Sequence, residues 1–363
     1  MLALLLVACQ PSSAAHTSFG GASDVTTTAG TGSTTSAGTS TGSESGSGGG
    51  STDTMPGSVN DLGGMPDFGD TSPVGCRGKI DFLFVLSRHP NMAFRQEQLA
   101  LAFPQFIDTI ESKFADFDYH IMVVTGDDWW GSPACNEACL TPNCKAGEPC
   151  CEWGDASDKD KPCCDPDYPC DKQDFVTTCD WLWGAGEVFP AGSGGASNKP
   201  CPVEGGRRYL VKGQTDLKGT FECIAKVGSS GWGALGQALA AAVQHNLNGP
   251  GGCNGGFLRD DALLMVTSFG QLDVPGHDSE GTPAEWAKAV IDAKHGDDKS
   301  VIMFNIGTQD CLPDDPDDRM CVLAKMFPFH HLLYGEIADW GPGFAQAASL
   351  VETACAGFTP PLG

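Results

Sequence analysis

The sequence predicts an α/β fold: a doubly wound, mostly parallel central sheet with helices on both faces, interrupted by a Cys-rich, disulfide-stapled insertion. A buried strand, a polar loop and an amphipathic helix follow one another over residues 79–113, which is the first half of a β-α-β crossover. Short apolar runs and helical segments recur later in the chain. Ten of the 17 cysteines fall within residues 131–205, where the apolar runs stop.

The first strand is predicted over residues 79–86, because a Phe- and Val-rich run ends at a polar turn containing Pro90. The following helix is predicted over residues 93–113, and a second strand over 118–125. The apolar face expected for that helix is made of Phe94, Leu99, Leu101, Phe103, Phe106, Ile107 and Ile110. His120, in the middle of the second strand, is expected to be a packed or solvent-facing histidine.

Composition limits the partners. A net charge of −25 argues against nucleic acid and anionic membranes. Nucleotide binding is not expected either, because Gly-Lys-Ser/Thr and GxGxxG are both missing. Without Cys9, 16 cysteines remain, which fits eight disulfides formed in an oxidising compartment. The alternative is zinc, but there is no CxxC pair, and Cys150-Cys151 and Cys163-Cys164 are adjacent doublets.

The N-terminal residues suggest export. Residues 1–9 are apolar and end in Leu6-Val7-Ala8-Cys9, which resembles the lipobox of bacterial lipoproteins. The resemblance implies a signal peptide over 1–9 and acylation of Cys9. By the same analogy, Gln10 after the cysteine favours attachment to the outer membrane. The alternatives are a chance apolar N-terminus and a secreted protein. Residues 10–75 are rich in Gly, Ser and Thr, so a disordered linker is expected there. The α/β domain is then expected over residues 76–363.

The insertion at residues 131–205 has many Asp, Pro and Cys residues but few aliphatic runs, so cross-links are expected to order it. Its aromatic residues either form a recognition face or replace the missing aliphatic core. Its aspartates do not have the spacing of a calcium loop, so a solvated acidic surface is expected.

After the insertion, the remaining elements follow from local patterns. Residues 282–285 read Thr-Pro-Ala-Glu, a capping box that starts a helix ending near Lys294. The other predicted elements are strands at 207–212, within 254–267 and at 299–306, and helices at 234–246 and 344–355. His330-His331 is expected to be an isolated surface pair near a helix.

The order of these segments over 79–125 and 207–360 resembles a von Willebrand factor A-type domain of secreted bacterial proteins, including myxobacterial ones. In that family a metal-ion-dependent adhesion site uses an Asp-x-Ser-x-Ser loop, a Thr and a later Asp. The resemblance places these ligand positions at Ser87, His89 and Asn91 in the first loop, at Ser229 or Ser230, and at Gln271. Asp273 is the only carboxylate near the last position.

Neutral side chains at both Asp positions remove the charge that would offset dehydration of Mg²⁺ or Ca²⁺. We therefore expect a degenerate metal site, no cofactor, and a non-enzymatic, adhesion-like module that binds an unidentified protein at the cell envelope. It would touch the membrane through its lipid anchor alone. A structural envelope protein is one alternative. A hydrolase using Ser87 and His89, with Asp81 or Asp127 orienting the histidine, is another, but no Gly-x-Ser-x-Gly or His-Glu-x-x-His motif supports it.

Overall fold

The computed structural model of the chain describes residues 78–113, 115–127, 170–270, 273, 275, 278–307, 311, 318–334 and 341–358. The predicted signal peptide, the predicted linker and residues 131–169 of the predicted insertion lie outside the described residues. So do Cys9 and Gln271. None of the helices that are described is long and apolar enough to cross a membrane.

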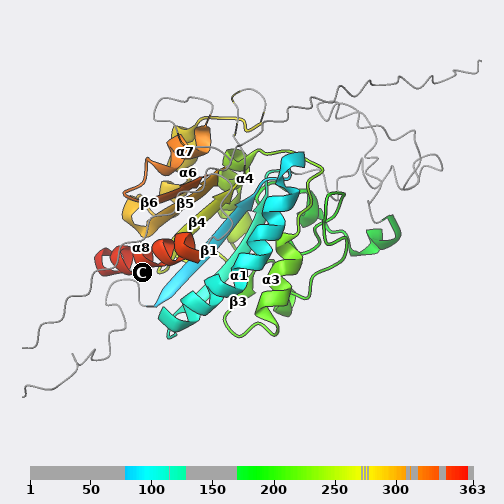
Figure 1. Cartoon of the computed structure of the whole chain (residues 1–363), viewed down its shortest axis with the longest axis horizontal. Coiled ribbons are helices and arrows are strands. Elements are labelled where there is room, and N and C mark those ends of the chain that lie inside the picture. Colours follow the sequence, from blue (N-terminus) through cyan, green and yellow to red (C-terminus); the bar gives the residue numbers. More distant parts are fainter. Residues whose placement is uncertain are drawn as a thin grey trace, which may run out of the picture. The chain divides into compact units, whose positions relative to one another are not determined.

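A six-stranded sheet forms the centre of the domain, with the order β3-β2-β1-β4-β5-β6 (Figure 1). All neighbouring strands are parallel except β3, which pairs antiparallel with β2 at one edge. The predicted mostly parallel α/β sheet is therefore confirmed. The strands are β1 (Lys79–Leu86), β2 (Asp118–Thr125), β3 (Leu210–Val211), β4 (Leu263–Phe269), β5 (Val301–Gly307) and β6 (Phe329–Tyr334).

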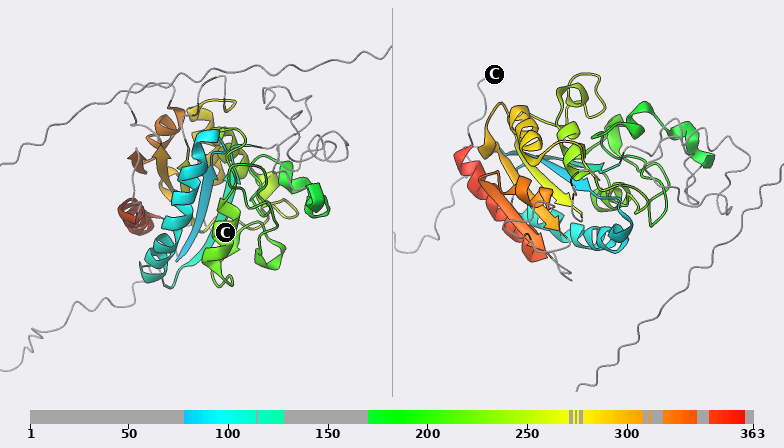
Figure 2. Two further views of the ribbon diagram at one scale, coloured as in Figure 1. Left: turned by 45° about the vertical axis from the view of Figure 1, so that its right-hand side comes forward. Right: turned by 90° about the horizontal axis from the view of Figure 1, so that it is seen from above.

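Helices cover both faces of this sheet, as predicted, and the two layers are seen in Figure 1 and in the right-hand view of Figure 2. The helices α1, α3 and α8 pack on one face, and α4, α6 and α7 on the other. The helices are α1 (Ala93–Lys113), α3 (Leu217–Ala225), α4 (Leu235–Ala242), α5 (His245–Asn248), α6 (Pro283–Ala293), α7 (Arg319–Ala324) and α8 (Gly341–Gly357).

The alternation of side chains along β1 creates the two cores. Phe82 and Phe84 point into the α1 layer, whereas Leu83 and Val85 point into the α4 layer. Ring contacts continue the first core, since Phe84 meets Phe221 with ring centroids 5.1 Å apart. A strand that is buried on both faces explains why residues 82–86 read as one continuous apolar run.

Helix α1 has the predicted bounds, but two residues of its predicted apolar face are wrong. Phe94 and Leu101 are 64% and 76% exposed. At about 100° per residue, they lie on the side of the helix opposite to Leu99 and Phe103. The apolar face predicted from the mixed three- and four-residue intervals therefore included two residues that lie outside the buried stripe.

Other predicted elements differ in extent. The helix predicted at 234–246 is two helices, because Gln244 adopts an extended conformation between α4 and α5. The strand predicted at 207–212 is only the two-residue β3. The capping box of α6 is present, with Thr282 and Glu285 bonded reciprocally. The sequence did not predict α3, α7 or β6. The surface placement of His331 is wrong, because His331 lies in β6 and its ring stacks on Phe304 of β5.

Disulfide bonds, expected from the cysteine count, are present. Every cysteine within the described part of the chain takes part in one: residues 170, 179, 201, 223, 253, 311, 321 and 355. The Cys179–Cys253 and Cys201–Cys223 bonds tie the described part of the insertion to the α/β domain. Trp183 of this segment also packs against the core on the α4 side of the sheet. Residues 170–205 are thus anchored by apolar packing as well as by sulfur.

Candidate functional site

The strand order reverses between β1 and β4, and in doubly wound sheets ligands bind beyond the carboxyl ends of strands at this point. Ser87 follows β1 there and is fully buried. Its backbone N–H donates to the Phe269 carbonyl at 2.9 Å, and its Oγ accepts from the backbone N–H of His89 at 3.1 Å. A Cβ on Gly270 would lie 3.0 Å from Ser87 Cβ, and one on Gly233 3.1 Å from its Oγ. The Ser87 hydroxyl is therefore enclosed by the protein.

His89 and Asn91 lie on the turn that joins β1 to α1. His89 is partly buried and caps the short helix Pro90–Met92, and its Nδ1 accepts from the backbone N–H of Asn91 at 3.4 Å. Asn91 is exposed. Ser87 and His89 thus bond to backbone groups of their own turn, which is not the nucleophile-to-base contact that covalent catalysis requires.

A second loop lies directly over the end of β1. The Arg88 N–H donates to the Trp232 carbonyl at 3.0 Å, and the Gly231 N–H donates back to the Arg88 carbonyl at 2.9 Å. The buried Arg88 guanidinium also donates to Ser230 Oγ at 3.3 Å and to the Ala191 carbonyl at 2.6 Å. The predicted residue Ser230 is therefore brought to the first loop, but its hydroxyl faces an arginine, a cation that the sequence analysis did not single out.

Ser229, the alternative to Ser230, is buried and turned toward the insertion. Its Oγ lies 3.5 Å from the Gly194 carbonyl, and its backbone N–H donates to the Ser193 carbonyl at 3.0 Å. Ser229 therefore fixes the described part of the insertion against the loop that covers β1.

Asp273, the carboxylate that follows the last predicted ligand position in the sequence, is held by other groups of the protein. Its carboxylate is fully buried and forms an ion pair with Arg319 of α7, and its Oδ2 accepts from the Gly236 N–H at 3.0 Å. Ser279 also donates to this carboxylate through its hydroxyl and its N–H. The negative charge is thus balanced by a guanidinium from a helix that the sequence did not predict.

Two further carboxylates lie at the carboxyl end of β2. Thr125 Oγ1 bonds to the Asp127 carbonyl at 2.9 Å and to Glu187 Oε1 at 3.1 Å. Burial raises the pKa of Glu187 to about 7, against the attraction of Arg208 and Arg88. Asp127 follows the predicted strand 118–125 and is one of the two residues considered for orienting His89; its Oδ2 accepts from the Trp232 backbone N–H at 3.0 Å. No local pattern pointed to Glu187, because it belongs to the insertion.

The orienting role considered for Asp81 is not supported by its position, since Asp81 lies near the start of β1, six residues before Ser87. It is fully buried and bonds to Arg259, and His120 Nδ1 is 3.5 Å from its Oδ1. Burial raises the pKa of Asp81 to about 6 and lowers the pKa of His120 to about 4. The expectation that His120 is a packed strand residue is confirmed by its contact with Tyr209, with ring centroids 4.7 Å apart.

One other cluster has metal-ligating residue types. Cys311, Asp318 and Cys321 lie together, but the two cysteines form a disulfide and Asp318 caps α7 by accepting from the Cys321 N–H. A disulfide offers no thiolate to a metal. At the first loop, Ser87, His89 and Asn91 offer hydroxyl, imidazole and amide ligands. The Asp278 carboxylate lies nearby, since a Cβ on Gly233 would be 3.9 Å from its Oδ1, and the Asp273 carboxylate is held by Arg319.

Comparisons with known proteins give little help. No family model and no curated protein matches the chain. One solved structure with some likeness is proximal thread matrix protein 1 (PTMP1) from the mussel byssus, with a TM-score of 0.35 and 11% sequence identity. The alignment covers 77% of this chain and 47% of that one. A likeness this low carries no functional inference, so the chain's own residues must supply it.

Proposed function

We propose that this chain is a non-enzymatic, protein-binding module of adhesion-like character, with an α/β domain related to von Willebrand factor A-type domains and a degenerate metal site. The observation that carries the proposal is the pairing of Asp273 with Arg319. Asp273, the carboxylate that follows the last ligand position in the sequence, is buried and neutralised by the protein itself. A fixed guanidinium there also repels a divalent cation.

The state of the first loop supports binding rather than chemistry. Ser87 is enclosed, and its hydroxyl is bonded to the backbone of its own turn. Asn91 and part of His89 remain at the surface, on a loop held by a rigid sheet. Loops of this kind carry much of protein recognition. The strand order, with its reversal between β1 and β4, is consistent with the proposed relationship.

The cellular setting is part of the proposal. The pairing of every described cysteine fits an oxidising compartment, and an envelope lipoprotein anchored through Cys9 would reside in one. The acidic composition fits a partner that is neither nucleic acid nor an anionic membrane.

The test is affinity capture of partners from a cell-envelope extract, with the full chain as bait. The proposal expects a defined protein that is retained by the wild type in EDTA and lost in His89→Ala. Glu97→Gln, an exposed substitution on α1, is the matched control and should retain it. Capture that requires Mg²⁺, or turnover of generic ester and peptide substrates that Ser87→Ala abolishes, would refute the proposal.

A further inference from the structure

An open groove of about 550 Å³ lies away from the first loop, over the α4 layer of the domain. Its lining combines apolar side chains with amides and carboxylates, and the size is within the range of ordinary ligand sites. Its floor is α4, and its far end is α5. The lining residues on which the inference depends are Leu182, Trp183, Gln237, Gln244, Asn246 and Glu280.

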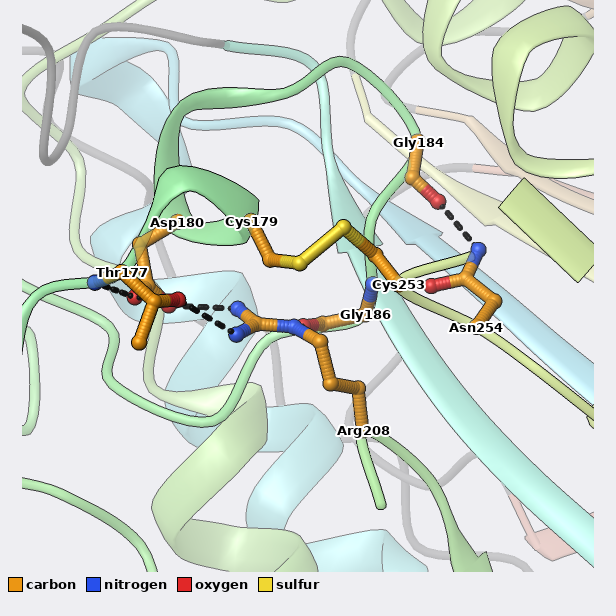
Figure 3. The surroundings of a disulfide bond; sticks show 8 residues. All are labelled: Thr177, Cys179, Asp180, Gly184, Gly186, Arg208, Cys253 and Asn254. Atoms are coloured by element: carbon orange, nitrogen blue, oxygen red, sulfur yellow. Dashed lines mark hydrogen bonds and ion pairs between the residues drawn. A yellow bond between two sulfur atoms is a disulfide. The ribbon is translucent and has the colours of Figure 1, made fainter. Parts of the chain in front are cut away.

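One wall of the groove is built by Leu182 and Trp183 of the insertion. Figure 3 shows the disulfide and the hydrogen bond that hold the chain on either side of them. Leu182 and Trp183 lie between Cys179, which is bonded to Cys253, and Gly184, whose carbonyl accepts from Asn254 Nδ2 at 2.8 Å. Gly184 has a φ of +75°, and a Cβ there would lie 2.2 Å from the backbone nitrogen of Ala242. Only glycine allows this approach, so the wall is seated directly on α4.

The opposite wall is also fixed, but it presents a free charge. The Glu280 backbone is bonded on both sides, because its N–H donates to Gln237 Oε1 at 3.1 Å and its carbonyl accepts from Trp286 Nε1 at 3.0 Å. The Glu280 side chain is exposed and has no bonded partner among the described residues. Glu285 adds a second carboxylate, which is engaged in the capping box of α6.

The charge of the groove decides its ligand. The described residues that line it include two carboxylates and no Lys, Arg or His, and the chain carries a net charge of −25. An anionic ligand is therefore disfavoured, and a cation is attracted from a distance. The half-buried indole of Trp183 offers an aromatic face of the kind that binds ammonium and guanidinium groups. The amides of Gln244 and Asn246 make no side-chain hydrogen bond within the described residues and are available to a peptide backbone.

We infer that this groove binds a Lys- or Arg-bearing extended segment of a protein partner, with the cationic side chain between Trp183 and Glu280 and apolar neighbours on Leu182 and the α4 floor. This rests on the proposed function only in that the natural segment belongs to a partner protein. The groove itself can be tested with peptides alone.

The experiment titrates the folded protein with acetyl-Ala-Leu-Lys-Leu-Ala-amide and follows amide chemical shifts around the groove. Matched peptides carry Gln or Glu in place of Lys, and triacetylchitotriose serves as a neutral saccharide. The Lys peptide should move signals of α4 and the turn at Glu280, the Gln peptide should bind more weakly, and the Glu peptide should not bind. High salt should weaken the binding of the Lys peptide.

Two variants locate the cation. Glu280→Gln should weaken binding of the Lys peptide about threefold, as expected for one exposed charge pair, while Glu97→Gln leaves it unchanged. Trp183→Ala should weaken it about tenfold through loss of the aromatic face. Because Trp183 is half-buried, the substitution of the exposed Glu280 decides the result if the Trp183 variant folds poorly.

Equal binding of the Lys and Gln peptides, or no effect of Glu280→Gln, would overturn the inference. The inference would also be overturned if triacetylchitotriose moved the same signals and the Lys peptide did not. That result would assign the groove to neutral saccharides. A captured envelope partner that depends on His89 but not on Glu280 would leave the proposed function standing and reject the groove as its docking site.

Discussion

The buried ion pair between Asp273 and Arg319 gives the sharpest test of how the buried charge beside α4 is balanced. Replacing Arg319 with Met keeps much of its apolar volume but removes the guanidinium. That group also donates to the Ser279 carbonyl at 2.8 Å and to the Gly281 carbonyl at 3.0 Å, and it lies 4.8 Å from the ring centre of Trp286. Asp273 would be left as a buried charge.

Breaking a buried pair from one side costs about 3–5 kcal/mol. Asp273 would keep three donors, two from Ser279 and one from Gly236, so we expect a loss of about 3 kcal/mol, at the lower end of that range. The double variant Arg319→Met with Asp273→Asn removes the charge and should recover about half of that loss. Urea unfolding at neutral pH, followed by tryptophan fluorescence, measures both.

The reasoning would be refuted if Arg319→Met cost less than about 1 kcal/mol, the range of an exposed pair. It would also fail if the two substitutions were additive, because neighbouring charges of one network should couple. Lys288→Met, which breaks an exposed pair with Asp292 on α6, is the matched control and should be nearly neutral.

The remaining predictions concern pH, disulfides, metal and anchoring. The pKa of Glu187 is about 7 in the folded protein and near 4.5 when unfolded, so the folded state holds the extra proton and stability falls as pH rises through that window. Glu187→Gln should remove this fall. Measured by urea unfolding, the free energy of unfolding of the variant should rise relative to the wild type by up to about 3 kcal/mol between about pH 5 and pH 8.5. The rise is smaller to the extent that solvent screens the group. Replacing Cys179 and Cys253 together by Ser should cost up to about 4 kcal/mol, from the 74-residue separation; an unchanged urea midpoint would contradict this. Millimolar Mg²⁺ or Mn²⁺ should leave the melting temperature unchanged, whereas a working site at a hundredfold excess over Kd would add about 2.7 kcal/mol; a rise that disappears in Asp273→Ala would show a rebuilt site. The full gene expressed in a Gram-negative host should give palmitate labelling that Cys9→Ser abolishes.

Local patterns explain which parts of the fold could be predicted. The strands β1 and β2 and the helix α1 have their predicted bounds. Their bounds could be predicted because long apolar runs and helical periodicity are patterns of consecutive residues. The capping box of α6 could also be predicted from the sequence, since all of its groups lie within four residues. The short elements α3, α7 and β6 carry too few residues for a clear period, and tertiary packing stabilises them.

The candidate site could be predicted only in part. The sequence placed Ser87, His89 and Asn91 in the loop after the first strand, and these residue types carry no negative charge. It could not show that Arg88 bonds to Ser230, 142 residues away, or that Arg319 neutralises Asp273, 46 residues away. Such pairs depend on where the chain returns to the same edge of the sheet.

The sequence by itself thus determined the α/β class, the positions of β1, β2 and α1 along the chain and the residue types available at the first loop, because periodicity, capping and residue type are local. The tertiary structure alone decided which charges meet. Burial makes an unpaired carboxylate so costly that Asp273 and Asp81 each lie against an arginine. It also decided that the insertion forms one wall of a groove. A disulfide and a glycine seat Leu182 and Trp183 on α4 through contacts between residues far apart in the chain.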